Sequence, residues 1–200
     1  MTRLFLALAF ALASVCTLPV AANAASGTAI FAGGCFWCVE SDFDKVPGVT
    51  STVSGYIGGS IQDPTYRNHP GFREAEKITF DPSKVSYKHL LDVYWHSVDP
   101  TDSGGQFCDR GHSYTTAIYA TTDEELKEAK ASKQQAQKEL GKPIVTEVKK
   151  APKFWKAEDY HQDYYRKNPE RYEYYRSACG RNRAVEAVWG SSAYTGIAGH

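Results

Sequence analysis

The chain has 200 residues, and its 23 basic and 23 acidic side chains cancel at pH 7. A chain without net charge offers no electrostatic attraction to nucleic acid or to an anionic membrane surface, so we expect neither as a partner. Aromatic residues make up 13% of the chain, which is enough for the core of one ordinary domain.

Residues 1–24 have the pattern of a secretory signal peptide. Arg3 precedes an apolar run from Leu4 to Val15, and Ala22-Asn23-Ala24 supplies the small residues of a cleavage site. The apolar run is shorter than the ~20 residues that span a bilayer. We therefore expect a cleaved leader over residues 1–24 and one domain over residues 25–200. We also expect a protein that is periplasmic or secreted and free of the membrane after cleavage.

The first predicted elements are a strand over residues 28–32 and a helix from Cys35 to about Lys45, joined by Gly33-Gly34. Free backbone N–H groups and the helix dipole surround a side chain at the start of a helix, and both favour a thiolate. The thiolate is the reactive form of cysteine. The sequence therefore predicts that Cys35 is a nucleophile.

The cysteines leave several interpretations open. Outside the leader the chain has Cys35, Cys38, Cys108 and Cys179. An even number in an oxidising compartment usually indicates structural disulfides, as in a disulfide-stapled binding module. Zinc binding is less well matched, because Cys108 and Cys179 do not form a second close pair. The Cys-x-x-Cys motif also fits a thioredoxin-like thiol–disulfide exchanger that uses Cys35 and Cys38.

The rest of the chain alternates irregularly between predicted strands, helices and loops. Strands are predicted over residues 49–56, 73–80, 114–120 and 144–148, and helices over residues 87–98, 122–140 and 170–177. Loops span residues 60–72 and 99–112. This order favours an α+β fold with a mixed or mainly antiparallel sheet flanked by helices, and a long irregular C-terminal segment. We expect the tyrosines among residues 172–175 to serve only in packing.

Several motifs together resemble one known family. They are Gly33-Gly34-Cys35-Phe36-Trp37, Gly55-Tyr56-x-Gly58-Gly59, Pro64-Thr65-Tyr66, Glu74 before Phe80-Asp81-Pro82, Asp109-x-Gly111-x-x-Tyr114, and Glu158-Asp159-Tyr160-His161-Gln162 with Asn168-Pro169. In this order, over residues 28–170, they resemble the peptide methionine sulfoxide reductase A family. The resemblance implies a ferredoxin-like two-layer sandwich. It also implies an oxidoreductase that repairs oxidative damage by reducing methionine S-sulfoxide, free or in proteins.

The resemblance implies roles for four residues in the chemical step. Cys35 would attack the sulfoxide sulfur and become a sulfenic acid. Because oxygen leaves poorly unless it is protonated, an acid must stand beside it. Glu74 would be that acid, with its pKa raised by an apolar pocket. Tyr66 and Tyr114 would donate hydrogen bonds to the same oxygen. The neighbouring Glu76 shares the strand face but does not match the family's acid.

The resemblance also implies how the substrate is held. Phe36 and Trp37 would hold the S-methyl group, and Asp109 would bind the substrate backbone or a water network. Phe72 stands where the family usually has a histidine, and the segment over residues 66–74 is shorter than usual.

A second thiol must then attack the sulfenic acid to form a disulfide. The resemblance favours Cys179, placed in a flexible C-terminal tail. Cys38, one helical turn from Cys35, and Cys108, beside Asp109, remain alternatives. We expect no bound cofactor and no metal. An external thiol reductant, thioredoxin-type in the cell or dithiothreitol in an assay, would open the disulfide of a monomeric enzyme.

Overall fold

The computed structural model describes residues 26–200. The predicted signal peptide over residues 1–24 lies outside the described residues. Between residues 26 and 200, no helix is both long enough and apolar enough to cross a membrane.

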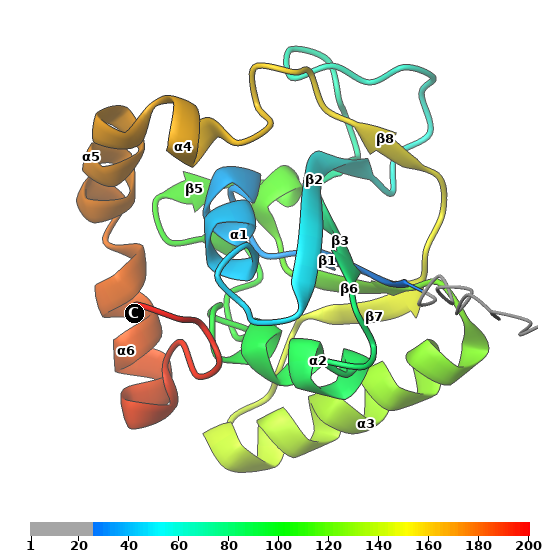
Figure 1. Ribbon diagram of the computed structural model, residues 1–200, viewed down its shortest axis with the longest axis vertical. Coiled ribbons are helices and arrows are strands. Elements are labelled where there is room, and N and C mark those ends of the chain that lie inside the picture. The colour runs from blue at the N-terminus through cyan, green and yellow to red at the C-terminus, as the bar shows by residue number, and fades with distance from the viewer. Residues whose placement is uncertain (1–25) are drawn as a thin grey trace, which may run out of the picture.

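A six-stranded sheet forms the centre of the molecule (Figure 1). Its strand order is β7 (Glu147–Lys150), β6 (Ala117–Ala120), β1 (Gly27–Ala32), β3 (Arg73–Phe80), β2 (Val49–Ile57) and β8 (Phe154–Lys156). Neighbouring strands are antiparallel except for the parallel pair β6 and β7. A separate hairpin consists of β4 (Gly105–Gln106) and β5 (Asp109–Arg110). The predicted α+β class and mainly antiparallel sheet are confirmed.

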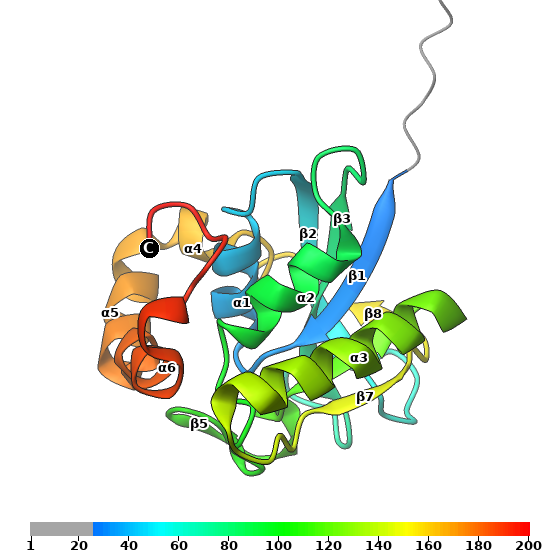
Figure 2. The ribbon, with the colours of Figure 1, turned by 90° about the horizontal axis from the view of Figure 1, so that it is seen from below.

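Three helices cover one face of this sheet: α1 (Phe36–Phe43), α2 (Tyr87–Trp95) and α3 (Asp123–Leu140) (Figure 2). The helix α1 packs on β2 and β3, α2 on β1, and α3 on β6 and β7. Side-chain caps fix two of the helix starts, because Ser86 accepts the N–H of His89 and Thr122 accepts the N–H of Glu125. Gly141 ends α3 in the left-handed conformation.

The main core lies between the sheet and these helices. Phe31, Ile78 and Ile118 from the strands meet Leu90 and Tyr94 of α2, and all five side chains are fully buried. Burying each large apolar side chain contributes roughly 1.5–3 kcal/mol. The hydroxyl of Tyr94 also donates to the carbonyl of Ala32 at 2.8 Å. This layer therefore fixes the point where β1 ends and the first loop begins.

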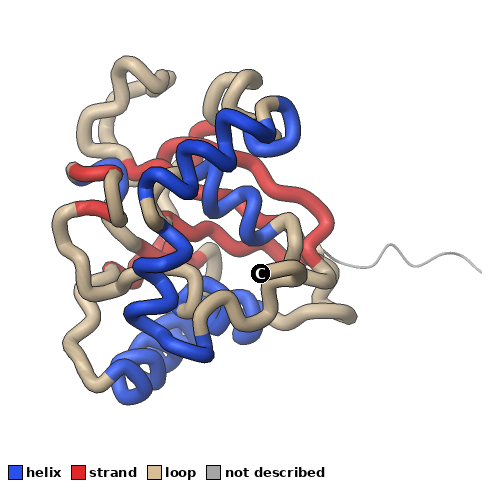
Figure 3. Tube along the Cα trace, turned by 90° about the vertical axis from the view of Figure 1, so that its left-hand side faces the viewer, coloured by secondary structure: helices blue, strands red, loops and turns tan. Residues whose placement is uncertain are grey.

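The C-terminal quarter corrects the prediction of a long irregular segment. It contains α4 (Tyr164–Lys167), α5 (Pro169–Cys179), α6 (Arg181–Trp189) and a short 3-10 turn over Gly190–Ser192, and the helices lie side by side with α1 (Figure 3). Gly180, with φ of 71°, allows α5 to turn directly into α6. Val185 and Trp189 join the main core. The helix α6 was not predicted from the sequence, and it places Val185 and Trp189 four residues apart on the face that joins this core.

Candidate active site

The loop after β1 sets the position of Cys35. Gly34 has φ of 88°, and a Cβ on it would lie 2.7 Å from the Cβ of Gln106, so only glycine fits this turn. Cys35 is the N-cap of α1. Its side chain is 6% exposed and that of Cys38 is 2% exposed, and both thiols are free. The site therefore contains a buried dithiol at the start of a helix.

The ionisation of this dithiol differs from the sequence prediction. Burial, followed by a hydrogen bond with Cys38, raises the pKa of Cys35 well above its usual value. The hydrogen bond with Cys35 is in turn the largest cause that lowers the pKa of Cys38, to about 7. Desolvation at Cys35 outweighs the helix terminus, which on its own favours the thiolate. Burial therefore opposes the thiolate that the start of the helix favours, and the role of Cys35 as the nucleophile stays a prediction.

All seven residues predicted to attack, protonate or hold the substrate line one small cavity of about 50 Å³. They come from the loop before α1 and the start of α1, the loop before β3, the start of β3, the β4–β5 hairpin and the 3-10 turn over His112–Tyr114. The cavity is lined by Cys35, Phe36, Trp37, Tyr66, Glu74, Asp109, Tyr114 and Tyr175.

Glu74 is the acid of this cavity. Its side chain is 1% exposed, and its Oε2 accepts the backbone N–H of Phe36 at 3.0 Å. Burial raises the pKa of Glu74 to about 8, against the opposing effect of that N–H, and nearby Asp109 adds to the rise. Glu74 is therefore mostly protonated at neutral pH. Glu76 is also buried, but it accepts from Ser54 at 2.8 Å and does not line the cavity.

Two phenols face Glu74 across the cavity. Burial is the first cause that raises the pKa of both Tyr66 and Tyr114, and the charge of Glu74 adds to it. Both groups therefore keep their protons and can donate hydrogen bonds. Glu158 holds the backbone of Tyr66 in place. Its carboxylate accepts the N–H of Tyr66 and the hydroxyl of Tyr56, each at 2.9 Å.

The aromatic wall is built before any substrate arrives. Phe36 is 1% exposed and lies 4.9 Å, ring to ring, from His161. Trp37 donates its Nε1–H to Nδ1 of His161 at 3.1 Å and stacks on Tyr164 with ring centroids 3.7 Å apart. Each ring is held from two sides, so the apolar wall is preorganised.

Tyr175 is the site residue that the sequence reasoning missed. Its hydroxyl donates to Oδ2 of Asp109, and it also hydrogen-bonds to Cys35. Contrary to the packing role expected for the tyrosines among residues 172–175, this one lines the cavity. One signal was available: Tyr175 lies four residues before Cys179, which places both on one face if the segment is helical.

The other two cysteines form a disulfide beside the cavity. Cys108 is exposed and bonded to Cys179, whose Sγ lies 4.0 Å from Oδ2 of Asp109. Cys179 stands at the end of α5 and not in a flexible tail. This pairing removes both sulfurs from a four-cysteine zinc site. The structure therefore separates a buried free dithiol from a surface disulfide.

The chemistry of the cavity defines a class of protein. A nucleophilic thiol, a carboxyl group that keeps its proton at neutral pH and two phenols suit a substrate whose oxygen must be protonated as it leaves. The fold and the site are those of a thiol-dependent oxidoreductase.

Comparison with known proteins identifies the family. The sequence profile of peptide methionine sulfoxide reductase matches residues 27–193. Peptide methionine sulfoxide reductase MsrA 2 of Rhizobium meliloti is 55% identical over 195 residues, which cover 96% of this chain and 98% of that protein. MsrA of Bacillus subtilis is 47% identical over 169 residues, covering 82% and 96%.

Solved structures agree with this match. Methionine sulfoxide reductase A of Corynebacterium diphtheriae superposes with a TM-score of 0.69 at 28% identity, covering 74% of this chain and 77% of that one. Mxr1 from Saccharomyces cerevisiae in reduced form gives 0.68 at 28% identity, covering 74% and 89%. The chain belongs to the peptide methionine sulfoxide reductase family, and its activity is the reduction of methionine sulfoxide.

Proposed function

We propose that the chain reduces methionine S-sulfoxide, free or in proteins, with Cys35 as the attacking sulfur and Glu74 as the general acid. The observation that carries this proposal is the Glu74 carboxyl group, which is buried in the same cavity as Cys35 and has a pKa of about 8. An ionised carboxylate could not protonate the leaving oxygen. Burial therefore supplies the acid that the reaction needs.

The first step transfers the sulfoxide oxygen to Cys35. As the Cys35 sulfur bonds to the sulfoxide sulfur, Glu74 gives its proton to the oxygen and takes up the thiol proton. The oxygen then passes as a hydroxyl group to Cys35, and both its bond to the methionine sulfur and the new sulfur–sulfur bond break, which releases methionine. Methionine sulfoxide gains two electrons and Cys35 becomes a sulfenic acid. Tyr66 and Tyr114 donate hydrogen bonds to the oxygen while its charge changes.

Phe36 and Trp37 supply the apolar wall for the S-methyl group. The cavity of about 50 Å³ admits a group as small as a methyl sulfoxide, which supports a preference for methionine over bulkier sulfoxides. Asp109 stands at the rim, held by Tyr175, where a carboxylate can accept from a substrate backbone N–H or order water.

For the second step we favour Cys38 as the resolving thiol. It packs with Cys35 in one cluster, whereas Cys179 is bonded to Cys108. When Cys108 and Cys179 are reduced, they can open the Cys35–Cys38 disulfide by exchange and take up its oxidation. An external thioredoxin-type dithiol then reduces the exposed Cys108–Cys179 disulfide. Yeast Mxr1 has been solved in complex with Trx2, which suits a reductant of this kind here.

The proposal is tested by reduction of dabsyl-methionine sulfoxide with dithiothreitol. We expect Cys35→Ser to be inactive and Glu74→Gln to be strongly impaired. Glu76→Gln is the matched control, because it changes a buried carboxyl group of the same strand outside the cavity. Full activity of Cys35→Ser would contradict the assignment of Cys35 as the attacking sulfur. A thioredoxin-like exchanger would instead reduce insulin disulfides without any dependence on Glu74.

We further propose that the protein acts as an exported monomer, periplasmic or secreted. The signal-peptide pattern of residues 1–24 supports export. N-terminal sequencing of the protein recovered from the periplasm would test this, with cleavage after Ala24 expected. Recovery of the uncleaved chain in the cytoplasm would contradict it.

A further inference from the structure

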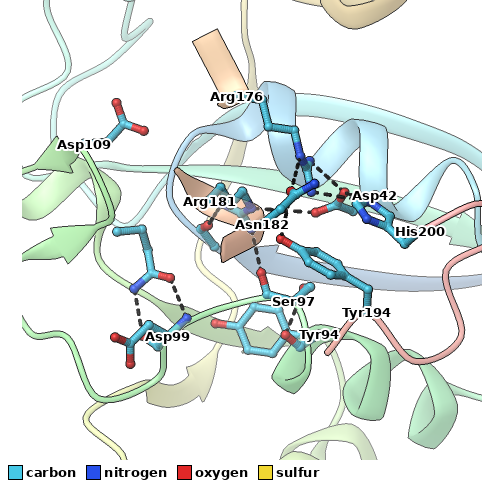
Figure 4. Close-up of polar contacts among 12 residues, drawn as sticks. Asp42, Tyr94, Ser97, Asp99, Asp109, Arg176, Arg181, Asn182, Tyr194 and His200 are labelled. Atoms are coloured by element: carbon cyan, nitrogen blue, oxygen red, sulfur yellow. Dashed lines mark hydrogen bonds and ion pairs between the residues drawn. The ribbon is translucent and has the colours of Figure 1, made fainter. Parts of the chain in front are cut away.

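Two arginines from the C-terminal helices meet the carboxylate of Asp42 on α1 (Figure 4). Arg176 of α5 places Nη1 2.8 Å from Oδ1 of Asp42, and Arg181 of α6 places Nε 3.7 Å from Oδ2. Arg176 is 8% exposed, Arg181 2% and Asp42 fully buried. Two guanidinium groups against one carboxylate leave an excess of positive charge in the protein interior.

The other partners of these arginines are neutral. Arg176 also donates to the hydroxyl of Tyr172 at 2.9 Å and to Oδ1 of Asn182 at 2.8 Å. Arg181 donates to the carbonyl of Gly33 at 3.0 Å and to that of Ser97 at 2.8 Å. The Nε of Arg181 has no hydrogen-bond partner among residues 26–200. A buried charge without a counter-ion is costly, so the cluster favours a further anion nearby.

Cys38 is the ionisable group placed to supply that anion. It precedes Asp42 by four residues on α1, so both side chains leave the same face of the helix. That face is directed at α5, where Cys38 packs against Tyr172, the residue whose hydroxyl Arg176 holds. The arginines that bind Asp42 therefore also lie next to Cys38.

We propose that Arg176 and Arg181 are positioning residues that hold the negative charge of the dithiol on Cys38 and so make Cys38 the sulfur that resolves the Cys35 sulfenic acid. This inference rests on the proposed function. It assigns a task in the resolving step to two buried arginines of the C-terminal helices.

The charged and titratable groups around the dithiol agree with this direction. After the hydrogen bond with Cys35, the charges of Arg181 and Arg176 are the causes that lower the pKa of Cys38, while burial and Asp42 oppose them. The groups that face the pair from the other elements are acidic or phenolic: Glu74 of β3, Asp109 of the hairpin, and Tyr172 and Tyr175 of α5. The charge of Glu74 raises the pKa of Cys35, whereas the hydrogen bond of Tyr175 lowers it. Arg181 and Arg176 are the cationic groups that lower the pKa of Cys38. His200 also contacts Asp42, with Nε2 3.2 Å from Oδ1.

The resolving step balances with groups already in the site. The Cys38 thiolate attacks the Cys35 sulfur, a sulfur–sulfur bond forms and the sulfur–oxygen bond breaks. The hydroxide leaves with the proton of Glu74 as water. Cys38 supplies the electron pair of the new bond, so its sulfur is oxidised and the sulfenic sulfur of Cys35 is reduced, both to the disulfide level. Glu74 is then reprotonated by solvent.

The first test measures the ionisation of Cys38 without any sulfoxide chemistry. In Cys35→Ser, iodoacetamide alkylation of the Cys38 peptide is followed by mass spectrometry as a function of pH. We expect the midpoint of this variant to rise by about one pH unit or more when Arg176→Gln is added, and to recover with Arg176→Lys. Arg166→Gln is the matched control, because this exposed arginine pairs with Asp44 of the same helix. A midpoint unchanged by Arg176→Gln would overturn the proposal.

The second test uses the intact dithiol. After one turnover, dimedone trapping measures how long the Cys35 sulfenic acid survives. We expect its decay to accelerate about fivefold from pH 6 to pH 8 in the unaltered protein. The thiolate fraction of a group with a pKa of about 7 rises about tenfold, while about half of Glu74 has lost its proton by pH 8. We expect Arg176→Gln to slow the decay at pH 7 while the amount of methionine released in that turnover stays the same. A pH-independent decay in the unaltered protein would overturn the proposal even if the variant fails to fold. Absence of released methionine would instead contradict the proposed function.

Discussion

Glu74→Gln offers the sharpest test of the chemistry. Glutamine has nearly the shape of glutamate, and its carbonyl oxygen can still accept the N–H of Phe36, but it has no acidic proton to give. Loss of a general acid typically costs ~10²–10⁴ in rate, which corresponds to roughly 3–5 kcal/mol of barrier. We expect a fall of this size in kcat/KM for dabsyl-methionine sulfoxide.

The pH profile gives the same prediction a second readout. With a pKa of about 8, Glu74 is roughly 90% protonated at pH 7 and roughly 10% at pH 9. We expect the first-turnover rate of the unaltered protein to fall about tenfold across this interval. In Glu74→Gln that alkaline decline should disappear, because the group that titrates is gone. A surviving decline near pH 8, or activity within a few-fold of the unaltered protein, would refute Glu74 as the acid.

Glu74→Gln should lower activity but raise the stability of the fold at alkaline pH. The folded protein keeps the Glu74 proton up to pH about 8, whereas the unfolded chain loses it near pH 4.5, the ordinary pKa of a glutamate side chain. Folding is therefore unpenalised below pH 4.5 and progressively penalised as the pH rises to 8, by up to about 5 kcal/mol. We expect urea unfolding to show Glu74→Gln more stable than the unaltered protein at pH 9 and equal to it at pH 4.

Four further predictions follow from individual contacts. Burial raises the pKa of Glu76 well above its usual value, so Glu76→Gln should raise the urea midpoint at pH 9 and leave kcat unchanged. Trp37→Ala removes the stack on Tyr164 and should raise KM about tenfold, with a smaller change in kcat. Gly34→Ala sets a Cβ 2.7 Å from that of Gln106 at φ of 88°, which should lower the unfolding free energy by about 1–3 kcal/mol. Cys179→Ser breaks the surface disulfide, so it should slow turnover with a thioredoxin-type donor but not the methionine released in the first turnover.

Local sequence patterns located most of the fold. The strand over residues 73–80 and the helix over residues 122–140 were predicted almost to their ends, because strong alternation and clear caps mark them. The predicted strand over residues 144–148 was displaced, since the observed β7 spans Glu147–Lys150. β8 and α6 were missed, because their positions depend on pairing with β2 and on packing against the main core.

The sequence by itself determined the parts of the site that lie within motifs. Cys35 after two glycines, Glu74 on its strand and the two tyrosines in loops could be named from the chain, and the structure gathers them around one cavity. The direction of the Glu74 pKa was also predictable, since an acid in this reaction must keep its proton.

Only the tertiary structure decided which of the four cysteines are free, which are paired in a disulfide and how the free thiols ionise. Burial raises the pKa of Cys35, whereas the hydrogen bond with Cys35 and then the charges of Arg181 and Arg176, far away in the sequence, lower the pKa of Cys38. The approach of α5 to the β4–β5 hairpin bonds Cys179 to Cys108 and brings Tyr175 against Asp109. Thiol ionisation and disulfide pairing depend on desolvation and on distances between remote segments, and neither is written in local sequence.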